Sequence, residues 1–166
     1  MFYIQILTEM KTIKNPLTVS ALLIVIANTL FAFYSFANLP DTIPIHFGVD
    51  GTPNGWGPKF SIFLIPIINL VLSGFMISVR KQPFSYLNLP IKISQNNLEE
   101  RLKLGTELLD IITLIISFLF LMIEMNIVMV SQNPNYGKYM MIAIFALIVV
   151  ILGISVHYTR KINKLA

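Results

Sequence analysis

Residues 39–59 read LPDTIPIHFGVDGTPNGWGPK and separate two long apolar runs. Pro40, Pro44 and Pro53 cannot donate a hydrogen bond to a strand ladder, and the glycines between them let the backbone turn. We therefore predict an irregular loop of successive turns. Some of its side chains are apolar enough to pack into a compact cap with its own small core. These are Ile43, Ile45, Phe47 and Trp56.

The same loop holds the polar groups from which a recognition site could be built. It contains the single tryptophan, one of the two histidines and two acidic residues. We predict that a ligand or signal is recognised by His46, Trp56, Lys59, Asp41 and Asp50. One imidazole and two carboxylates could bind zinc or a harder cation, but no short histidine–histidine or histidine–glutamate ligand pair is present. We therefore predict no metal and no cofactor, and expect the histidine to bond within its own loop.

A family resemblance rests on the spacing of these residues. The pattern comprises Leu39-Pro40-Asp41, Ile43-Pro44, His46-Phe47, Gly51, Pro53-Asn54-Gly55-Trp56 and Lys59. Set between two hydrophobic runs, it resembles the N-terminal domain of unknown function in SdpI-type bacterial immunity proteins, over roughly residues 17–70. The resemblance implies a plasma-membrane protein that confers resistance to a secreted toxin and relays its presence to a repressor. The remaining part of the chain is shorter than in those proteins and does not match their second domain.

Composition places the chain among integral membrane proteins. Its 166 residues are 55% hydrophobic and only 12% charged, its mean hydropathy is +0.75, and soluble domains carry about 25% charged residues. The absence of cysteine excludes a disulfide framework, a thiolate metal site and a cysteine nucleophile. The formal net charge of +4 is explained by membrane topology rather than by nucleic-acid binding.

Four apolar stretches are long enough to cross a bilayer, for which about 20 helical residues suffice. Ten of the twelve lysines and arginines fall on one side of these spans, so the positive-inside rule puts both termini in the cytoplasm. We predict an all-α membrane protein of four transmembrane helices in two hairpins, with a compact extracellular loop between the first two. The predicted segments are an N-terminal cytoplasmic or interfacial stretch (1–16), the first span (17–38), the extracellular cap (39–59), the second span (60–79), a cytoplasmic connection (80–105), the third span (106–129), an extracellular turn (130–138), the fourth span (139–156) and a basic cytoplasmic tail (157–166).

Two short helices are expected at the inner surface. Residues 1–15 mix apolar and charged residues, which is typical either of an amphipathic surface helix or of a partly ordered terminus. Asn97 and Glu100 resemble a capping pair, and they predict an interfacial helix over residues 98–104 before the third span.

Polar residues inside the spans indicate where the bundle interior lies. Asp110, Ser117 and Glu124 recur every seven residues and therefore share one helix face. A carboxylate in a span is costly and needs a partner or a proton, and Asn28 and Asn69 lie at suitable depths. Glu124 is interpreted either as a proton-, cation- or ligand-linked site or as a hydrogen-bonded helix contact. For the two asparagines we expect interhelical hydrogen bonds.

Three functions agree with this pattern. The leading hypothesis is recognition of a peptide toxin or envelope signal at the outer face, for immunity or signalling. The second is an oligomeric proton- or cation-coupled transporter that uses Glu124, and the third is an accessory subunit of a membrane complex. No phosphate loop, nucleophile elbow, HExxH or CxxC motif is present, so we do not expect an enzyme. The expected partners are membrane lipids, a peptide or protein at the outer face and a second copy of the chain, but no nucleic acid.

Overall fold

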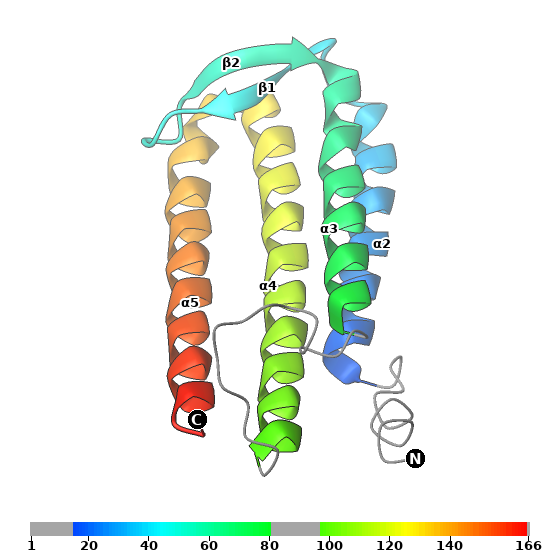
Figure 1. The fold of residues 1–166 in the computed structure, drawn as a ribbon. Helices are drawn as coiled ribbons and strands as arrows, with labels where there is room; N and C mark the ends of the chain where they lie inside the picture. Colours follow the sequence, from blue (N-terminus) through cyan, green and yellow to red (C-terminus); the bar gives the residue numbers. More distant parts are fainter. Residues whose placement is uncertain (1–14, 81–96, 166) are drawn as a thin grey trace.

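The computed structural model describes residues 15–80 and 97–165. Four long helices run side by side, and a two-stranded sheet lies across one end of them (Figure 1). The elements in chain order are α2 (Pro16–Phe36), β1 (Thr42–Phe47), β2 (Pro53–Pro58), the 3-10 helix η1 (Lys59–Phe63), α3 (Leu64–Arg80), α4 (Leu98–Gln132), the 3-10 helix η4 (Pro134–Tyr136) and α5 (Gly137–Asn163). The amphipathic helix predicted for residues 1–15 lies outside the described residues, apart from Asn15, which precedes α2.

The four helices are each long and apolar enough to cross a hydrocarbon core of about 30 Å. The chain is therefore a multi-pass membrane protein with four spans, as its sequence predicts. α2, α3 and α4 all contact one another, whereas α5 packs chiefly against α4. Only 6% of the most apolar window of α5 is buried, against 28% in α2 and α4, so most of α5 is left uncovered by the other described elements.

Local chemistry sets where the first two spans begin and end. The Asn15 side chain caps α2 by accepting a hydrogen bond of 2.9 Å from the Leu17 amide, and Pro16 occupies the first turn. α2 ends at Phe36, two residues before the predicted limit, because the chain turns there through a hydrogen bond of 3.0 Å from the Asn38 amide to the Ser35 carbonyl. The second span starts as η1 and continues as α3, with Pro66 in the first turn of α3, where a missing amide donor costs little.

The prediction of a separate interfacial helix over residues 98–104 is wrong. α4 is one continuous helix of 35 residues, about 52 Å long at the usual rise, so it extends beyond the hydrocarbon core. A single glycine, Gly105, costs about 1 kcal/mol in a helix interior but does not end it. The side chain of Asn97 does not cap α4. Its Nδ2 atom instead donates a hydrogen bond of 3.0 Å to the carbonyl of Leu165, which lies beyond α5.

The prediction of an irregular loop over residues 39–59 is also wrong, because β1 and β2 form an antiparallel hairpin. Thr42 pairs with Pro58, Pro44 with Trp56 and His46 with Gly55, with register irregularities around His46. Both strands of a two-stranded sheet are edge strands, so a proline can direct its missing donor away from the ladder. At the tip the Gly48 amide donates 2.8 Å to the Thr52 carbonyl, and Gly51 has a φ of +82°.

The hairpin does have an apolar core, but it shares this core with the helices. The buried cluster consists of Leu39, Ile43, Ile62 and Ile127. Phe47 packs against the cluster, whereas Ile45 and Trp56 are 50% and 54% exposed, contrary to the predicted cap core. The hairpin is thus anchored by one apolar face and leaves apolar side chains uncovered.

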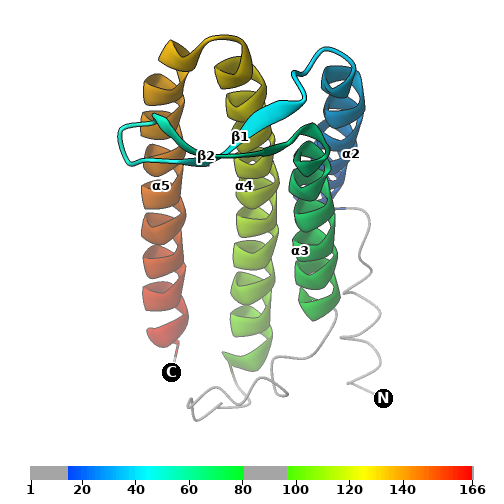
Figure 2. The same ribbon diagram turned by 90° about the horizontal axis from the view of Figure 1, so that it is seen from above.

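The tip of the hairpin reaches the start of α5. A Cβ placed on Gly137 would lie 2.0 Å from the carbonyl oxygen of Gly51, so only glycine permits this approach. Seen from above, the hairpin crosses the end of the bundle between α3 and α5 (Figure 2). The hairpin therefore rests on both halves of the bundle.

Candidate functional site

A chain of polar side chains joins α2, α3 and α4 in the bundle interior. Asn28, Asn69 and Glu124 are all 0% exposed. The side-chain amide of Asn28 donates to Glu124 Oε2, and that of Asn69 donates 3.0 Å to Asn28 Oδ1. The structure therefore brings together the three intramembrane residues that the sequence placed at similar depths.

Hydroxyl groups extend this chain along α3 and α4. Ser73 Oγ donates 3.2 Å to Asn69 Oδ1 and lies 3.0 Å from Ser117 Oγ. Ser117 in turn donates 2.9 Å to the carbonyl of Thr113 on its own helix. Asn69 also donates 3.3 Å to the Ser117 carbonyl, so α3 and α4 are bonded through both side chains and backbone. The four residues Asn28, Asn69, Ser73 and Ser117, together with Glu124, form what we call the polar core.

Glu124 is incompletely satisfied within the polar core. Its Oε1 atom is buried and has no hydrogen-bond partner, while Oε2 receives one amide donor. In the described part of the chain, two other side chains bury polar atoms without partners: Arg101 and Asn126. Asn126 is two residues, about 200°, further round α4 and so faces away from the polar core. An ionised carboxylate removed from water is expensive unless it is paired, which makes Glu124 the most unusual group in the bundle.

Asp110 belongs to a different part of α4. Its carboxylate accepts 2.9 Å from Thr18 Oγ1 and 2.6 Å from Asn15 Nδ2. Fourteen residues separate it from Glu124, which corresponds to about 21 Å along a helix. Asp110 therefore ties the start of α2 to α4 and does not face Glu124.

The five recognition residues predicted in the cap do not converge on one pocket. Lys59 Nζ lies 3.0 Å from Asp41 Oδ1 at the base of the hairpin and 5.3 Å from the centre of the Phe36 ring. The His46 imidazole Nδ1 instead bonds to Asn54 Oδ1 on the opposite strand. Among the described residues, no group of three histidine, cysteine, aspartate or glutamate side chains is placed to hold a metal ion.

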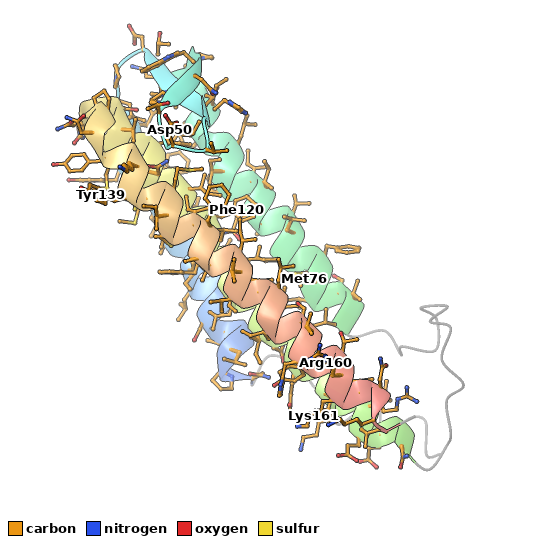
Figure 3. The ribbon with its side chains drawn as sticks, turned by 90° about the vertical axis from the view of Figure 1, so that its left-hand side faces the viewer. Asp50, Met76, Phe120, Tyr139, Arg160 and Lys161 are labelled. Carbon is orange, nitrogen blue, oxygen red and sulfur yellow. The ribbon has the colours of Figure 1, made fainter. Side chains whose placement is uncertain are left out.

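Asp50 lies at the tip of the hairpin (Figure 3), in a turn of its own. Its Oδ1 accepts 2.7 Å from Thr52 Oγ1 and 3.1 Å from the Thr52 amide. These two hydrogen bonds hold the pKa of the Asp50 carboxyl below its usual range, and the bond from the Thr52 hydroxyl has the larger effect. Asp50 therefore stabilises the turn as a carboxylate.

Part of the exposed surface of the hairpin is aromatic or apolar. Trp56 is 54% exposed, and Val49 near the tip is 87% exposed. The glycines on either side of Trp56 make room for the opposite strand, since a Cβ on Gly55 or Gly57 would lie 2.9 Å from His46 or Ile45 respectively. The sequence GWG thus lets two side chains of β1 lie over β2 while the indole remains accessible.

The buried face of the hairpin meets α4 beside Glu124. Ile43 of β1 is 0% exposed and clusters with Ile127, and Ile123 packs against the same cluster. These two isoleucines flank Glu124 on α4, one residue before it and three after it. The buried side of β1 therefore packs on the helical turn that carries the buried glutamate.

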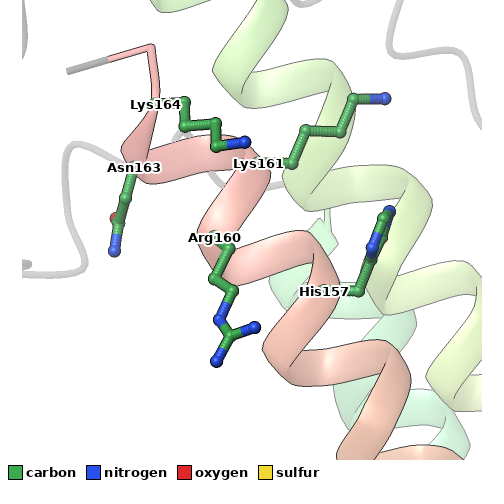
Figure 4. A pocket seen from close by; sticks show the side chains of 5 residues that line it. All are labelled: His157, Arg160, Lys161, Asn163 and Lys164. Carbon is green, nitrogen blue, oxygen red and sulfur yellow. The ribbon is translucent and has the colours of Figure 1, made fainter.

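The opposite end of the molecule is basic. Four side chains at and just beyond the end of α5 line an open pocket together with Asn163: His157, Arg160, Lys161 and Lys164 (Figure 4). Their spacing of three, four and seven residues puts them near one another on the helix. Arg160 and Lys161 lie at the end of α5 remote from Asp50 and the hairpin (Figure 3).

Comparison with known proteins identifies one segment of the chain. Residues 23–70 match the family described as Domain of unknown function (DUF1648). The match runs from α2 through the hairpin into α3 and includes Asn28 and Asn69, but Glu124 on α4 lies outside it. The DUF1648 segment thus supplies two members of the polar core and α4 supplies the carboxyl group.

The relatives add no activity. An uncharacterized protein of Archaeoglobus fulgidus is 25% identical over 59 residues, which cover 36% of this chain and 32% of that protein. The match therefore spans about a third of the relative's length. No solved structure matches the chain.

Several contacts of the site were missed from the sequence. Asn15 directly before Pro16 is a helix-capping signal that could have located the start of α2. Thr18 follows one turn later, but nothing in the sequence indicates that it bonds Asp110. The sequence likewise holds no signal for the close approach of Gly51 to Gly137, since neither glycine is part of a motif that predicts contact between them.

Proposed function

We propose that the protein is a membrane receptor that binds an amphipathic peptide or another envelope signal at its hairpin, in the manner implied by the resemblance to SdpI-type immunity proteins. The proposed orientation puts the hairpin outside the cell. In its support, the basic end of α5 and the start of α2 lie at the other end of the bundle (Figure 1), where cytoplasmic lysines and arginines are expected.

The observation that carries this proposal is the two-sided construction of the hairpin. One face is anchored through Ile43, while Trp56, Ile45 and Val49 remain accessible. Each strand also has one edge that pairs with no other strand, to which an extended peptide can add main-chain hydrogen bonds at the positions that are not proline. An amphipathic peptide would cover the exposed apolar side chains and gain affinity from their burial.

Binding would reach the membrane interior through the same element. Because Ile43 packs beside Ile127 and Ile123, a shift of β1 would move the turn of α4 that carries Glu124. The polar core then connects this turn to α2 and α3 through Asn28 and Asn69. In this proposal the hairpin recognises and the polar core transmits, and no catalytic group is needed.

The arrangement of the polar core favours signalling over proton transport. A proton relay needs groups that both accept and release a proton, such as hydroxyls, water or carboxyls. Two carboxamides, Asn28 and Asn69, stand between Glu124 and the hydroxyls of Ser73 and Ser117. This series of hydrogen bonds is thus a structural link rather than a continuous proton path.

The proposal is tested by the survival of cells exposed to a secreted membrane-active peptide toxin. Trp56→Ala and His46→Ala should each abolish protection while leaving the amount of membrane-inserted protein unchanged. Tyr139→Ala is the matched control, because Tyr139 is an exposed aromatic at the start of α5 outside the hairpin. Protection that survives both hairpin changes would remove the hairpin from the mechanism.

A direct measurement uses the only tryptophan of the chain. In lipid nanodiscs, the toxin peptide itself should shift the emission of Trp56 to shorter wavelength and reduce its quenching by acrylamide, because binding would cover the half-exposed indole. An unchanged spectrum at saturating peptide would contradict binding at this surface.

A further inference from the structure

Glu124 has an environment that suits a neutral carboxyl group better than a charged one. It is 0% exposed, one oxygen has no partner, and the other receives a single amide from Asn28. A buried carboxylate normally needs an opposite charge or several donors. A protonated carboxyl needs much less compensation, because burying an unpaired hydroxyl costs far less than burying an unpaired charge.

Among the described residues, the elements packed around Glu124 supply no countercharge; α5, which packs on α4, carries Lys138, Arg160 and Lys161 at exposed positions. α2 contributes the side-chain amide of Asn28, and α3 contributes Asn69 and Ser73, and all three side chains are uncharged. From the hairpin side come the apolar residues clustered with Ile43. The charged residues at the hairpin base, Asp41 and Lys59, pair with each other.

The remaining charged groups of the described part of α4 lie at a distance along the helix. Asp110, the nearest, is about 21 Å away and bonded to Thr18 and Asn15. The others precede it in the sequence: Glu99, Glu100, Arg101, Lys103 and Glu107. No cation of α4 therefore stands beside Glu124.

We propose that Glu124 is a proton-binding site, occupied at neutral pH when the hairpin is seated on the bundle. The proton sits on the carboxyl group and keeps the polar core neutral, so that α2, α3 and α4 pack together. This inference does not depend on the receptor role, since it concerns the resting protein without any peptide.

The hairpin controls access to this proton. Glu124 lies under the cluster of Ile43 and Ile127, and the carboxamides of Asn28 and Asn69 close the route towards the other end of the bundle. The proton must therefore leave on the hairpin side, when β1 lifts from α4. Loss of the proton would leave a bare carboxylate and favour water entry at the same place.

Infrared difference spectroscopy of the full chain in lipid tests the site. A protonated carboxylic acid has a carbonyl stretch that a carboxylate lacks. At pH 7 the wild-type protein should show this band, and selective ¹³C labelling of glutamate should shift it. The band should be absent in Glu124→Gln, which keeps the shape and a neutral charge, and retained in Glu107→Gln on the half-buried face of the same helix.

The outcomes are decisive in both directions. A glutamate band that disappears only in E124Q supports the site, whereas no glutamate band in the wild type, or one that persists in E124Q, overturns it. If E124Q fails to fold, the labelled wild type, E107Q and Glu9→Gln still decide by elimination, because the two remaining glutamates besides Glu124, Glu99 and Glu100, are exposed to solvent. Asp110→Asn should leave the labelled band unchanged, because aspartate is not labelled.

Access through the hairpin has its own readout. Deuterium should replace the Glu124 proton slowly in the wild type and several-fold faster in Ile43→Ala, which loosens the cover. Equal exchange rates would show that the hairpin does not control the proton. Protection that survives Trp56→Ala and His46→Ala, together with faster exchange in Ile43→Ala, would count against the receptor alone, so the two proposals can fail separately.

Discussion

The hairpin and the helix bundle have cores built on opposite rules. Under the hairpin the buried side chains are apolar: Leu39, Ile43, Ile62 and Ile127. Between α2, α3 and α4 the fully buried side chains include amides, hydroxyls and a carboxyl, while leucine, isoleucine and phenylalanine face outward. Water drives the first arrangement by the hydrophobic effect. Lipid supplies no such force between helices, so polar contacts and close packing organise the second.

The two cores meet within one turn of α4, between Glu124 and Ile127. This junction explains why a buried carboxyl can be held with one hydrogen bond: the apolar cluster excludes water from above it, and the polar core orients it from the side. A substitution in either core should therefore alter the packing at this junction. The loss of stability should reflect lost apolar burial under the hairpin and lost hydrogen bonds in the polar core.

The largest effect is expected from Ile43→Ala. Replacing a fully buried isoleucine by alanine in an apolar core costs about 2–5 kcal/mol. Here the cost should fall on the packing of the hairpin against the bundle rather than on the stability of the bundle itself. Acrylamide quenching of Trp56 should rise, and chemical denaturation should show an early transition in tryptophan emission that precedes the loss of helical circular dichroism.

Ile45→Ala is the matched control on the same strand. Its side chain is half exposed, so the change should shift the tryptophan transition by no more than about 0.5 kcal/mol. Equal effects of the two substitutions would mean that the buried cluster around Ile43 does not hold the hairpin on the bundle.

A smaller effect is expected from Asn28→Leu in the polar core. This change removes the donor to Glu124 and the acceptor of Asn69, and hydrogen bonds between membrane helices are worth about 0.6–1.7 kcal/mol. Unfolding in mixed micelles of sodium dodecyl sulfate should therefore show a destabilisation of about 1–2 kcal/mol.

A double change distinguishes a polar core from simple packing. Adding Glu124→Leu to Asn28→Leu removes both partners and should recover part of the lost stability, because no buried carboxyl is then left unpaired. Thr29→Val is the control, since Thr29 bonds only the Val25 carbonyl of its own helix. If the double variant is as unstable as the sum of the singles, the pair contributes by shape alone.

The spans and the polar core were predictable for a physical reason. Apolar runs of about 20 residues have few fates other than crossing a bilayer, and a polar residue in such a run must face the interior. Counting residues along Asn28, Asn69 and Glu124 therefore gave their common depth. Depth alone could not reveal that Asp110 bonds Thr18 and Asn15, because this depends on how α2 leans against α4.

The hairpin was not predictable by the same reasoning. Prolines at 44, 53 and 58 argue against strands in a sheet interior, but a ribbon of two edge strands tolerates them. Once β1 and β2 pair, Asp41 and Asp50 fall at opposite ends of the hairpin, one bonded to Lys59 and the other to Thr52. Their separation follows from the strand pairing, which the loop interpretation lacked.

The smallest effect concerns the polar turn at the hairpin tip. Thr52→Val keeps the shape of the side chain but removes the hydroxyl that bonds Asp50. The hydrogen bonds lower the pKa of Asp50, so the turn gains stability from the carboxylate above the ordinary aspartate pKa of about 3.9 and loses it as the pH falls through the lowered value. In Thr52→Val this pKa should rise towards its ordinary value, as followed by the carboxyl chemical shift of ¹³C-labelled aspartate.

The same titration separates the tip from the rest of the molecule. The carboxyl chemical shift of Asp41 at neutral pH should be the same in both proteins, because Asp41 contacts Lys59 rather than Thr52. Tryptophan emission and helical circular dichroism should also be unchanged by Thr52→Val at neutral pH, since Asp50 is exposed and touches neither core. A change in either signal would mean that the tip, through the approach of Gly51 to Gly137, helps to hold the hairpin on α5.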